Sequence, residues 1–226
     1  MKRHVLSVRL WHWLNLVSVV ILFMSGLNIS NAHRYLYWGQ WGFSPEQAWL
    51  AVPRFPGWAT IPNYYSLASA RDWHILMAWP FALGLLFMWI AMLVSRHFWR
   101  DLRTSPWEWH PKTIRADVIN HLKLDFNPAP AKYNLLQRMA YGAVLGVLLP
   151  GMIFSGLAIS PGFESAAPWL VEGFGGRQSA RSIHFIFAWG IFAFTAVHIV
   201  LVLLTGPIGQ IRAMITGGDV IKGGRA

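Results

Sequence analysis

Four apolar runs, each long enough to cross a membrane, constrain this chain more than any other feature. They extend over about residues 10–29, 73–94, 139–159 and 183–204. A helix needs roughly 20 apolar residues to cross a hydrocarbon core of about 30 Å, and its backbone polar groups must be satisfied within the segment. The sequence therefore predicts an all-α fold, an integral membrane four-helix bundle that forms a single domain over residues 1–226.

The composition agrees with a membrane protein. Hydrophobic residues make up 55% of the chain and charged residues 12%, whereas charged residues are about 25% of a typical soluble domain. The two middle runs contain no Asp, Glu, Lys or Arg. The chain also has no cysteine, which excludes an iron–sulfur cluster, a thiolate-bound or covalently attached haem, and a disulfide within it.

Positive charge predicts the orientation. The N-terminal segment, the connection between the second and third runs, and the C-terminal segment hold three, eight and three of the 19 Lys and Arg residues. Cytoplasmic connections are enriched in Lys and Arg, so we expect both termini to be cytoplasmic. Insertion and anionic lipid account for the net charge of +10, which therefore implies membrane lipid and no nucleic acid as a partner.

The first 30 residues have a second interpretation, as a secretory signal peptide. Lys2 and Arg3 precede the apolar run, and Ser30-Asn31-Ala32 resembles a cleavage site. The run is too long for a signal peptide and carries His12, so we expect it to be retained as a membrane anchor.

The connections differ in character. Residues 30–71 form a long aromatic loop that we expect to be periplasmic, either lying at the membrane interface or docking a partner, two interpretations that are compatible. Within it, Ser44 followed by Pro45 predicts the start of a short helix. Residues 95–134 are basic and contain four prolines, so we expect an irregular surface loop there.

Two histidines lie on one face of the fourth run. His184 and His198 are fourteen residues apart, which places them within roughly 40° of each other around a helix and about 21 Å apart along its axis. Ionisable groups inside a membrane are costly and usually functional. His74 opens the second run and His12 lies near the start of the first, which predicts two pairs at two depths, His74 with His184 and His12 with His198. We expect the remaining histidines to be solvated or interfacial: His4, His33, His97, His110 and His121.

Three of these four histidines follow an arginine by three residues. Arg9, Arg71 and Arg181 precede His12, His74 and His184. Residues at this spacing share a helix face, so each arginine is placed to pair with carboxylates at the edge of a macrocycle, such as haem propionates. The alternative is an arginine that extends to the water from the end of a span.

A short repeat closes the first and third runs. Ser25-Gly26-Leu27 and Ser155-Gly156-Leu157 both lie at the expected periplasmic end. Gly26 and Gly156 either make room for a flat cofactor or belong to ordinary small-residue helix packing.

A haem held by two imidazoles fits this histidine pattern better than zinc or a proton relay. Zinc prefers four ligands at one site, whereas these histidines are divided between two levels. A proton relay would alternate histidines with acids, and the runs have none beyond Asp72 at one end. Haem iron with two axial ligands has no open position for a substrate, which favours electron transfer.

The chain is similar to the bacterial b561-type cytochromes, the membrane subunits of quinone-linked formate dehydrogenases, nickel–iron hydrogenases and thiosulfate reductases. The similarity extends over all four runs. Gly176–Arg181 is most similar to members that pair with periplasmic molybdopterin oxidoreductases. The residues that carry the resemblance are Arg9-Leu10-Trp11-His12-Trp13, Ser25-Gly26-Leu27, His74, Tyr133-Asn134-Leu135-Leu136-Gln137-Arg138, His184 and His198.

The resemblance implies two haems b in the bacterial inner membrane, with His12, His74, His184 and His198 as ligands of the haem iron. It also implies a site for ubiquinone or menaquinone beside the cytoplasmic haem, where Asn134 and Gln137 are the matching residues. The implied partner is a periplasmic oxidoreductase subunit, a molybdopterin enzyme, a hydrogenase or an iron–sulfur subunit.

We therefore expect a membrane cytochrome that transfers electrons between a periplasmic partner and the quinone pool, without a substrate-oxidising site of its own. Flow from the periplasm to quinone is the working hypothesis. Two alternatives remain open at this point. One is a stand-alone quinone-linked oxidoreductase acting on superoxide or another small oxidant, and the other is a non-haem assembly or transport subunit.

Overall fold

The computed structural model describes residues 6–96, 98–123 and 134–218. Lys2, Arg3, His4, His97 and Tyr133, which entered the expectations above, lie outside the described residues.

Four long apolar helices confirm the expected all-α membrane fold. Helices long and apolar enough to cross a membrane extend over Leu6–Ala32, Leu67–Val94, Leu135–Ile159 and Arg177–Leu204. Each helix begins four to six residues before the corresponding apolar run. The additional turn consists mostly of polar and interfacial residues, which extend the helix beyond the apolar run at the membrane surface. These helices are α1 (Leu6–Ala32), α2 (Leu67–Val94), the consecutive segments α4 (Leu135–Ala143), η5 (Val144–Leu148) and α5 (Leu149–Ile159), and α8 (Arg177–Leu204).

The chain divides into two compact units. The first unit comprises the residues up to Met88 and those from Gly151 onward, and the second comprises Trp89–Pro150. The first unit therefore contains α1, α8 and most of α2 and α5.

Aromatic and glycine contacts join the helices of the first unit. Phe23 of α1 stacks on Phe192 of α8, with 4.7 Å between the ring centroids. Gly151 of α5 lies so close to α8 that a Cβ on it would be 2.3 Å from the ring of Phe187. A Cβ on Gly84 of α2 would be 3.1 Å from Leu14 of α1. The helices thus approach closely where glycine leaves room, as is common between membrane helices.

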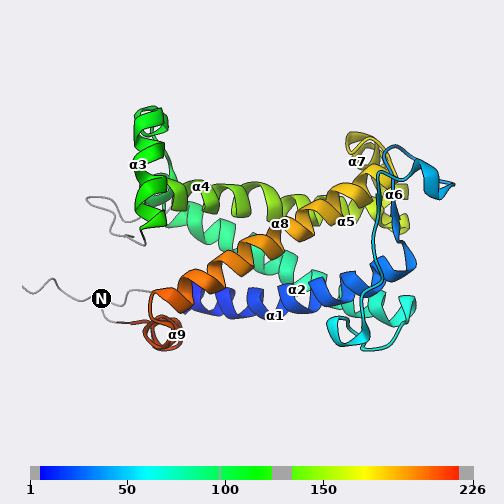
Figure 1. Cartoon of the computed structure of the whole chain (residues 1–226), viewed down its shortest axis with the longest axis horizontal. Helices are drawn as coiled ribbons and strands as arrows, with labels where there is room; N and C mark the ends of the chain where they lie inside the picture. The colour runs from blue at the N-terminus through cyan, green and yellow to red at the C-terminus, as the bar shows by residue number, and fades with distance from the viewer. Residues whose placement is uncertain (1–5, 97, 124–133, 219–226) are drawn as a thin grey trace, which may run out of the picture. The chain divides into compact units, whose positions relative to one another are not determined.

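One end of the first unit carries the aromatic connection together with α6 and α7 (Figure 1). We call it the loop end. The predicted short helix after Ser44 is a single 3-10 turn, and the Ser44 side chain makes no capping hydrogen bond. Tyr35 pairs with Ala51 in a two-residue antiparallel ladder. The elements at this end are β1 (Tyr35–Leu36), η1 (Pro45–Gln47), β2 (Leu50–Ala51), η2 (Gly57–Ala59), α6 (Pro161–Ala166) and α7 (Pro168–Gly173).

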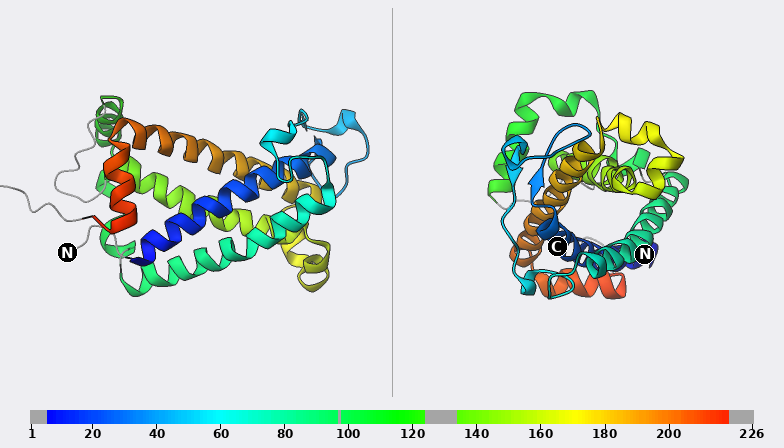
Figure 2. Two further views of the ribbon diagram at one scale, coloured as in Figure 1. Left: turned by 90° about the horizontal axis from the view of Figure 1, so that it is seen from below. Right: turned by 90° about the vertical axis from the view of Figure 1, so that its right-hand side faces the viewer.

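The opposite end of the first unit, which we call the terminal end, holds the start of α1 and the last helix, α9 (Pro207–Thr216). α9 turns across the end of α8 (Figure 2, left). The guanidinium of Arg9 donates to the carbonyls of Met214, at 3.2 Å, and of Ile215. Trp13 donates its indole N–H to Met214 at 3.3 Å. These bonds satisfy carbonyls at the C-terminal end of α9 and bring the two described chain ends together. Which side of the membrane they face stays a prediction.

The second unit corrects the expectation of an irregular loop over residues 95–134. It contains η3 (Phe98–Leu102), η4 (Pro106–Trp109) and the twelve-residue helix α3 (Pro111–Leu122). Pro111 is the first residue of α3, a position where the missing N–H leaves no hydrogen bond unmade. The carboxylate of Asp117 on α3 accepts from the backbone N–H of Leu136 at 2.8 Å, which ties α3 to the start of α4.

Candidate functional site

At the loop end, His74 of α2 faces His184 of α8. Their ring centroids are 6.1 Å apart and the ring planes are inclined by 57°. Both residues lie beyond the first turn of a long helix, so regular helical hydrogen bonds hold their backbones. The structure thus brings together the first of the two predicted pairs.

Each of these imidazoles contacts a buried serine on a neighbouring helix. The Ser25 hydroxyl of α1 is 2.9 Å from His74 Nδ1, and the Ser155 hydroxyl of α5 is 2.9 Å from His184 Nδ1. Sequence reasoning missed both serines as site residues, although the repeated Ser-Gly-Leu element contained the signal.

The following glycines, Gly26 and Gly156, lie against the same two rings. A Cβ on Gly26 would be 3.6 Å from His74 Cε1, and a Cβ on Gly156 would be 3.4 Å from His184 Cε1. Both distances are ordinary van der Waals contacts, so in this structure the glycines face the imidazoles themselves.

At the terminal end, His12 of α1 faces His198 of α8, with 6.4 Å between the ring centroids and 61° between the planes. Trp13 packs edge-on against His12 at 5.4 Å, and Phe194 stacks on His198 at 6.2 Å. The second predicted pair is therefore also brought together, and it has aromatic neighbours.

Both separations suit one metal ion held between two imidazoles. A bond from a transition metal to an imidazole nitrogen is about 2 Å long, so rings on opposite sides of one ion have centroids roughly 6 Å apart. Among the described residues, no group of three or more His, Cys, Asp and Glu is arranged to hold a metal ion. The two facing imidazoles of each pair fit a haem, which His74 with His184 and His12 with His198 would hold through its iron.

The predicted arginines have different surroundings. Arg71 lies three residues before His74 on α2, and Arg181 lies three residues before His184 on α8, so both are at the loop end. Burial is the main cause that lowers the pKa of His33, and the positive charges of Arg181 and Arg71 lower it further. Arg181 also donates to the side chain of Gln178 at 2.9 Å. Arg9, in contrast, is bonded to the C-terminal carbonyls of α9. Sequence reasoning placed His33 among the solvated histidines and missed its position beside two arginines.

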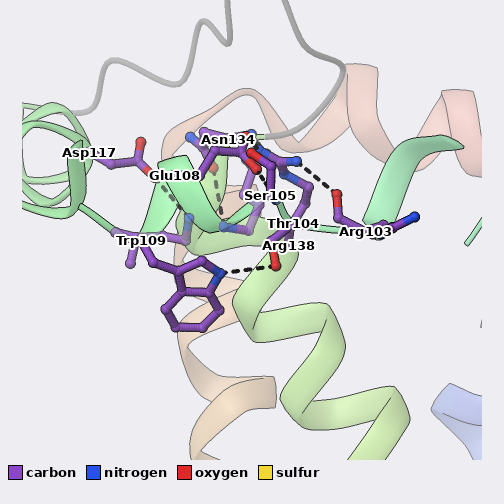
Figure 3. A network of polar contacts seen from close by, with 10 residues as sticks. Arg103, Thr104, Ser105, Glu108, Trp109, Asp117, Asn134 and Arg138 are labelled. Atoms are coloured by element: carbon purple, nitrogen blue, oxygen red, sulfur yellow. Dashed lines mark hydrogen bonds and ion pairs between the residues drawn. The ribbon is translucent and has the colours of Figure 1, made fainter. Parts of the chain in front are cut away.

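Asn134 and Gln137 lie in the second unit and cap α4. The Asn134 side chain accepts from the backbone N–H of Gln137 at 3.2 Å, and the Gln137 side chain accepts from the backbone N–H of Asn134 at 3.3 Å. Next to this cap, Arg138 donates to the carbonyl of Arg103 at 3.1 Å and forms an ion pair with Glu108 (Figure 3). The residues matched to a quinone site thus have a structural role in the helix start.

The aromatic connection is anchored to the first turns of α8. The carbonyl of Gly39 accepts from the backbone N–H groups of Gln178 and Ser179, both at 3.1 Å, and the Gln40 side chain accepts from the N–H of Arg177 at 2.9 Å. The first N–H groups of a helix have no partner within it, so the connection supplies their acceptors. These bonds hold the connection at the start of α8, on the loop-end side of His184. Nothing in the sequence pattern indicated this contact.

Comparisons with known proteins agree with one another. Residues 3–217 match the family model described as prokaryotic cytochrome b561. The chain is 31% identical over 212 residues to an Azospira oryzae protein named "Putative protein-methionine-sulfoxide reductase subunit YedZ1". The alignment covers 93% of this chain and 93% of the relative. It is 24% identical over 230 residues to a Cupriavidus necator protein named "Probable Ni/Fe-hydrogenase B-type cytochrome subunit", covering 95% of this chain and 85% of the relative.

An Azotobacter vinelandii protein of the same name is 24% identical over 233 residues, covering 96% of this chain and 88% of the relative. No solved structure matches the chain. The family match extends over nearly the whole sequence and includes all four apolar helices. The chain therefore belongs to the prokaryotic cytochrome b561 family and is a membrane b-type cytochrome that functions in electron transfer.

Proposed function

We propose that this cytochrome relays electrons between a periplasmic oxidoreductase partner and the quinone pool, with two haems b at two depths in the membrane. The observation that carries the proposal is the pair of facing imidazoles at each end of the first unit, 6.1 Å apart for His74 and His184 and 6.4 Å apart for His12 and His198. One helix, α8, contributes a ligand to each pair, so the two sites are held at a fixed separation of about 21 Å along its axis.

The four histidines also favour electron transfer over substrate chemistry. Haem b, when bound, supplies a one-electron iron couple. Because an imidazole would occupy each side of the macrocycle, the iron would have no open position for oxygen or another substrate. The protein's contribution is to hold the imidazoles and to set their hydrogen bonds.

Arg71 and Arg181 are the proposed partners of the propionates at the loop end. The charges of both arginines lower the pKa of His33, which supports a shared location at the loop end. Guanidinium groups bind carboxylates through two parallel hydrogen bonds. Arg9 is the proposed counterpart at the terminal end, where its bonds to Met214 and Ile215 leave other N–H donors of its five for a carboxylate.

The aromatic connection is the proposed docking surface for the partner. Phe43 is 82% exposed and Trp58 is 83% exposed, although both lie in a connection that is anchored to α8. Trp41 stacks against Phe43 at 6.3 Å between ring centroids, so these two rings form a continuous exposed apolar surface. Aromatic side chains of this kind contribute strongly to protein interfaces and also lie at membrane surfaces.

The proposed quinone site lies in the second unit. The capping bond of Gln137 uses its side-chain oxygen, so its amide NH₂ is the proposed donor to a quinone carbonyl. A cavity of about 320 Å³ lies nearby, lined by residues that include Trp99, Arg103 and Arg138. An aromatic wall with a few donors suits a quinone head group.

The direction of flow depends on the partner. A partner that oxidises its substrate delivers electrons to the cytochrome, and one that reduces its substrate withdraws them. Flow from the periplasm to quinone stays our working hypothesis. In liposomes that carry the cytochrome and its partner, reduction of an enclosed quinone analogue by the partner's substrate would support it, and turnover only with quinol as donor would reverse it.

The central test is the haem content of the purified full chain. A pyridine haemochrome assay should give two haems b per chain for the wild type, and one for His198→Ala and for His74→Ala. His110→Ala is the matched control, because His110 lies in the second unit and its Nδ1 accepts from the backbone of Lys112 at 3.3 Å. Unchanged content in either ligand variant would contradict the pairing.

A ligand variant could also lose both haems through misfolding. His184→Met decides in that case, because methionine is a haem ligand and raises the reduction potential. Only one of the two haems should then show a changed spectrum and a higher potential.

A further inference from the structure

Ser25 and Ser155 occupy equivalent positions against the two imidazoles of the loop-end pair. We propose that these serines are matched positioning residues, which hold His74 and His184 with the proton on Nδ1 and thereby lower the reduction potential of the haem between them. This inference rests on the proposed function, because it needs a haem at that pair.

The direction of the serine hydrogen bonds follows from the backbone around them. The Ser25 hydroxyl donates to the carbonyl of Ile21 at 2.7 Å, and the Ser155 hydroxyl donates to the carbonyl of Gly151 at 2.5 Å. A hydroxyl has one hydrogen, so each oxygen is left as an acceptor toward the imidazole 2.9 Å away. Nδ1 therefore carries the proton, and the lone pair of Nε2 is left for iron.

A second backbone carbonyl lies within reach of each serine hydroxyl. The Ser25 hydroxyl is 3.1 Å from the carbonyl of Leu22, and the Ser155 hydroxyl is 3.3 Å from the carbonyl of Met152. A carbonyl oxygen can only accept, so both neighbours on the serine's own helix direct its hydrogen away from the imidazole. The serine oxygen is thus left as the acceptor for Nδ1–H.

Burial makes the serine contacts hard to replace. Ser25 and Ser155 are both 0% exposed, so water has no access to take the place of a missing hydroxyl. The next residue in each case is the glycine that contacts the ring at Cε1, so a Ser-Gly dipeptide supports one edge of each imidazole. The arrangement occurs twice, with α1 supporting a ligand on α2 and α5 supporting a ligand on α8.

A hydrogen bond from Nδ1–H changes the electronic character of the ligand. An acceptor on this proton makes the imidazole more basic, which stabilises the more highly charged Fe(III) state relative to Fe(II). Two such bonds on one iron act in the same direction. The reduction potential of this haem should therefore be lower with the serines than without them.

The test is a redox titration of the purified full-length cytochrome, followed by its visible spectrum. Loss of an outer hydrogen bond to a metal ligand typically changes metal affinity by about tenfold. For Ser25→Ala we expect a tenfold shift of the Fe(III)/Fe(II) preference, which is a rise of about 59 mV for one electron. Ser155→Ala should give a similar rise, and the double variant a larger one. Only one of the two haems should respond, and its low-spin electron paramagnetic resonance signal should move with it.

Ser18→Ala is the matched control. Ser18 lies on α1 and is also 0% exposed, but its hydroxyl has no hydrogen-bond partner in the part of the chain that the structure describes. Its removal should leave both potentials unchanged. Ser25→Cys keeps the side-chain size but makes weaker hydrogen bonds, and should shift the potential in the same direction by less. Ser25→Thr keeps the hydroxyl and should have the wild-type reduction potential.

The outcomes separate two failures. Wild-type protein without haem at this pair would overturn the proposed function. Normal haem content with unchanged potentials in Ser25→Ala and Ser155→Ala would overturn only the role of the serines. If an alanine variant does not fold, Ser25→Cys decides, and an unchanged potential there has the same meaning.

Discussion

Trp49 of the aromatic connection donates a hydrogen bond from its indole nitrogen to the hydroxyl of Ser182, 2.9 Å away. Ser182 is 0% exposed and donates in turn to the carbonyl of Tyr37 at 2.6 Å. It lies two residues before His184 on α8. The connection that we propose as a docking surface is therefore bonded to the helix that carries a proposed haem ligand.

Ser182→Ala should loosen this junction. Two polar groups, the Trp49 N–H and the Tyr37 carbonyl, would lose a buried partner, and each such loss costs about 1–3 kcal/mol. We expect a lower thermal midpoint in detergent and faster hydrogen exchange at residues 37–49. Bulky oxidants in solution should also react faster with the reduced loop-end haem.

Ser165→Ala is the control for this prediction, because Ser165 is an exposed serine on α6 at the same end. It should change neither stability nor exchange. Equal exchange at residues 37–49 in Ser182→Ala and in the wild type would contradict the anchoring role.

Replacement of Gly26 or Gly156 distinguishes the two explanations of these residues. A Cβ at either position would make ordinary contacts with an imidazole, so Gly26→Ala and Gly156→Ala should keep both haems and nearly wild-type spectra. Gly156→Leu should displace the His184 ring and reduce haem content at the loop end. If instead both alanine variants lose that haem, the glycines make room for the macrocycle, as one interpretation of the sequence has it. Gly146→Ala is a suitable control, since nothing lies within 4 Å of its Cβ position.

Much of the fold could be predicted from the sequence because the membrane imposes a simple pattern. Apolar runs of sufficient length identified all four long helices, and the spacing of His184 and His198 placed them on one face. The serine contacts could not be predicted, because they depend on how α1 meets α2 and how α5 meets α8. The repeated Ser-Gly-Leu element indicated a shared position but not its target.

The helix α3 was missed for a different reason. Proline usually interrupts a helix, so the four prolines of residues 95–134 predict an irregular loop, whereas Pro111 is in fact the first residue of α3. The roles of Asn134 and Arg9 show a similar limit. A polar residue at the end of a span satisfies backbone groups as readily as it binds a cofactor, and the sequence does not distinguish these uses.

The ion pair of Glu108 and Arg138 predicts a dependence of stability on acid in the second unit. The hydrogen bond from Arg138 is the main cause that lowers the pKa of Glu108 below its ordinary value of 4.5. A carboxyl with a lowered pKa stabilises the fold above its unfolded pKa, and this stabilisation is lost as the pH falls through the folded value. The thermal midpoint of the wild type should therefore fall below about pH 4.5 more steeply than that of Glu108→Gln.

The comparison needs a second carboxylate variant. Glu172→Gln removes an exposed acid from α7 and should leave the acid dependence close to that of the wild type. Parallel curves for the wild type and Glu108→Gln would show that the pair contributes nothing to stability in this range.

His33 reports on the two arginines that we propose for the loop-end propionates. Its pKa is lowered from 6.5, first by burial and then by the charges of Arg181 and Arg71. A histidine with a lowered pKa binds its proton more readily in the unfolded chain, so this residue removes stability as the pH falls below 6.5. Arg181→Gln should raise the pKa of His33 toward 6.5, which a nuclear magnetic resonance titration of labelled histidine would measure. Arg54→Gln, an exposed arginine of the same connection, should leave it unchanged, and an unshifted His33 in Arg181→Gln would mean that the two side chains are not neighbours.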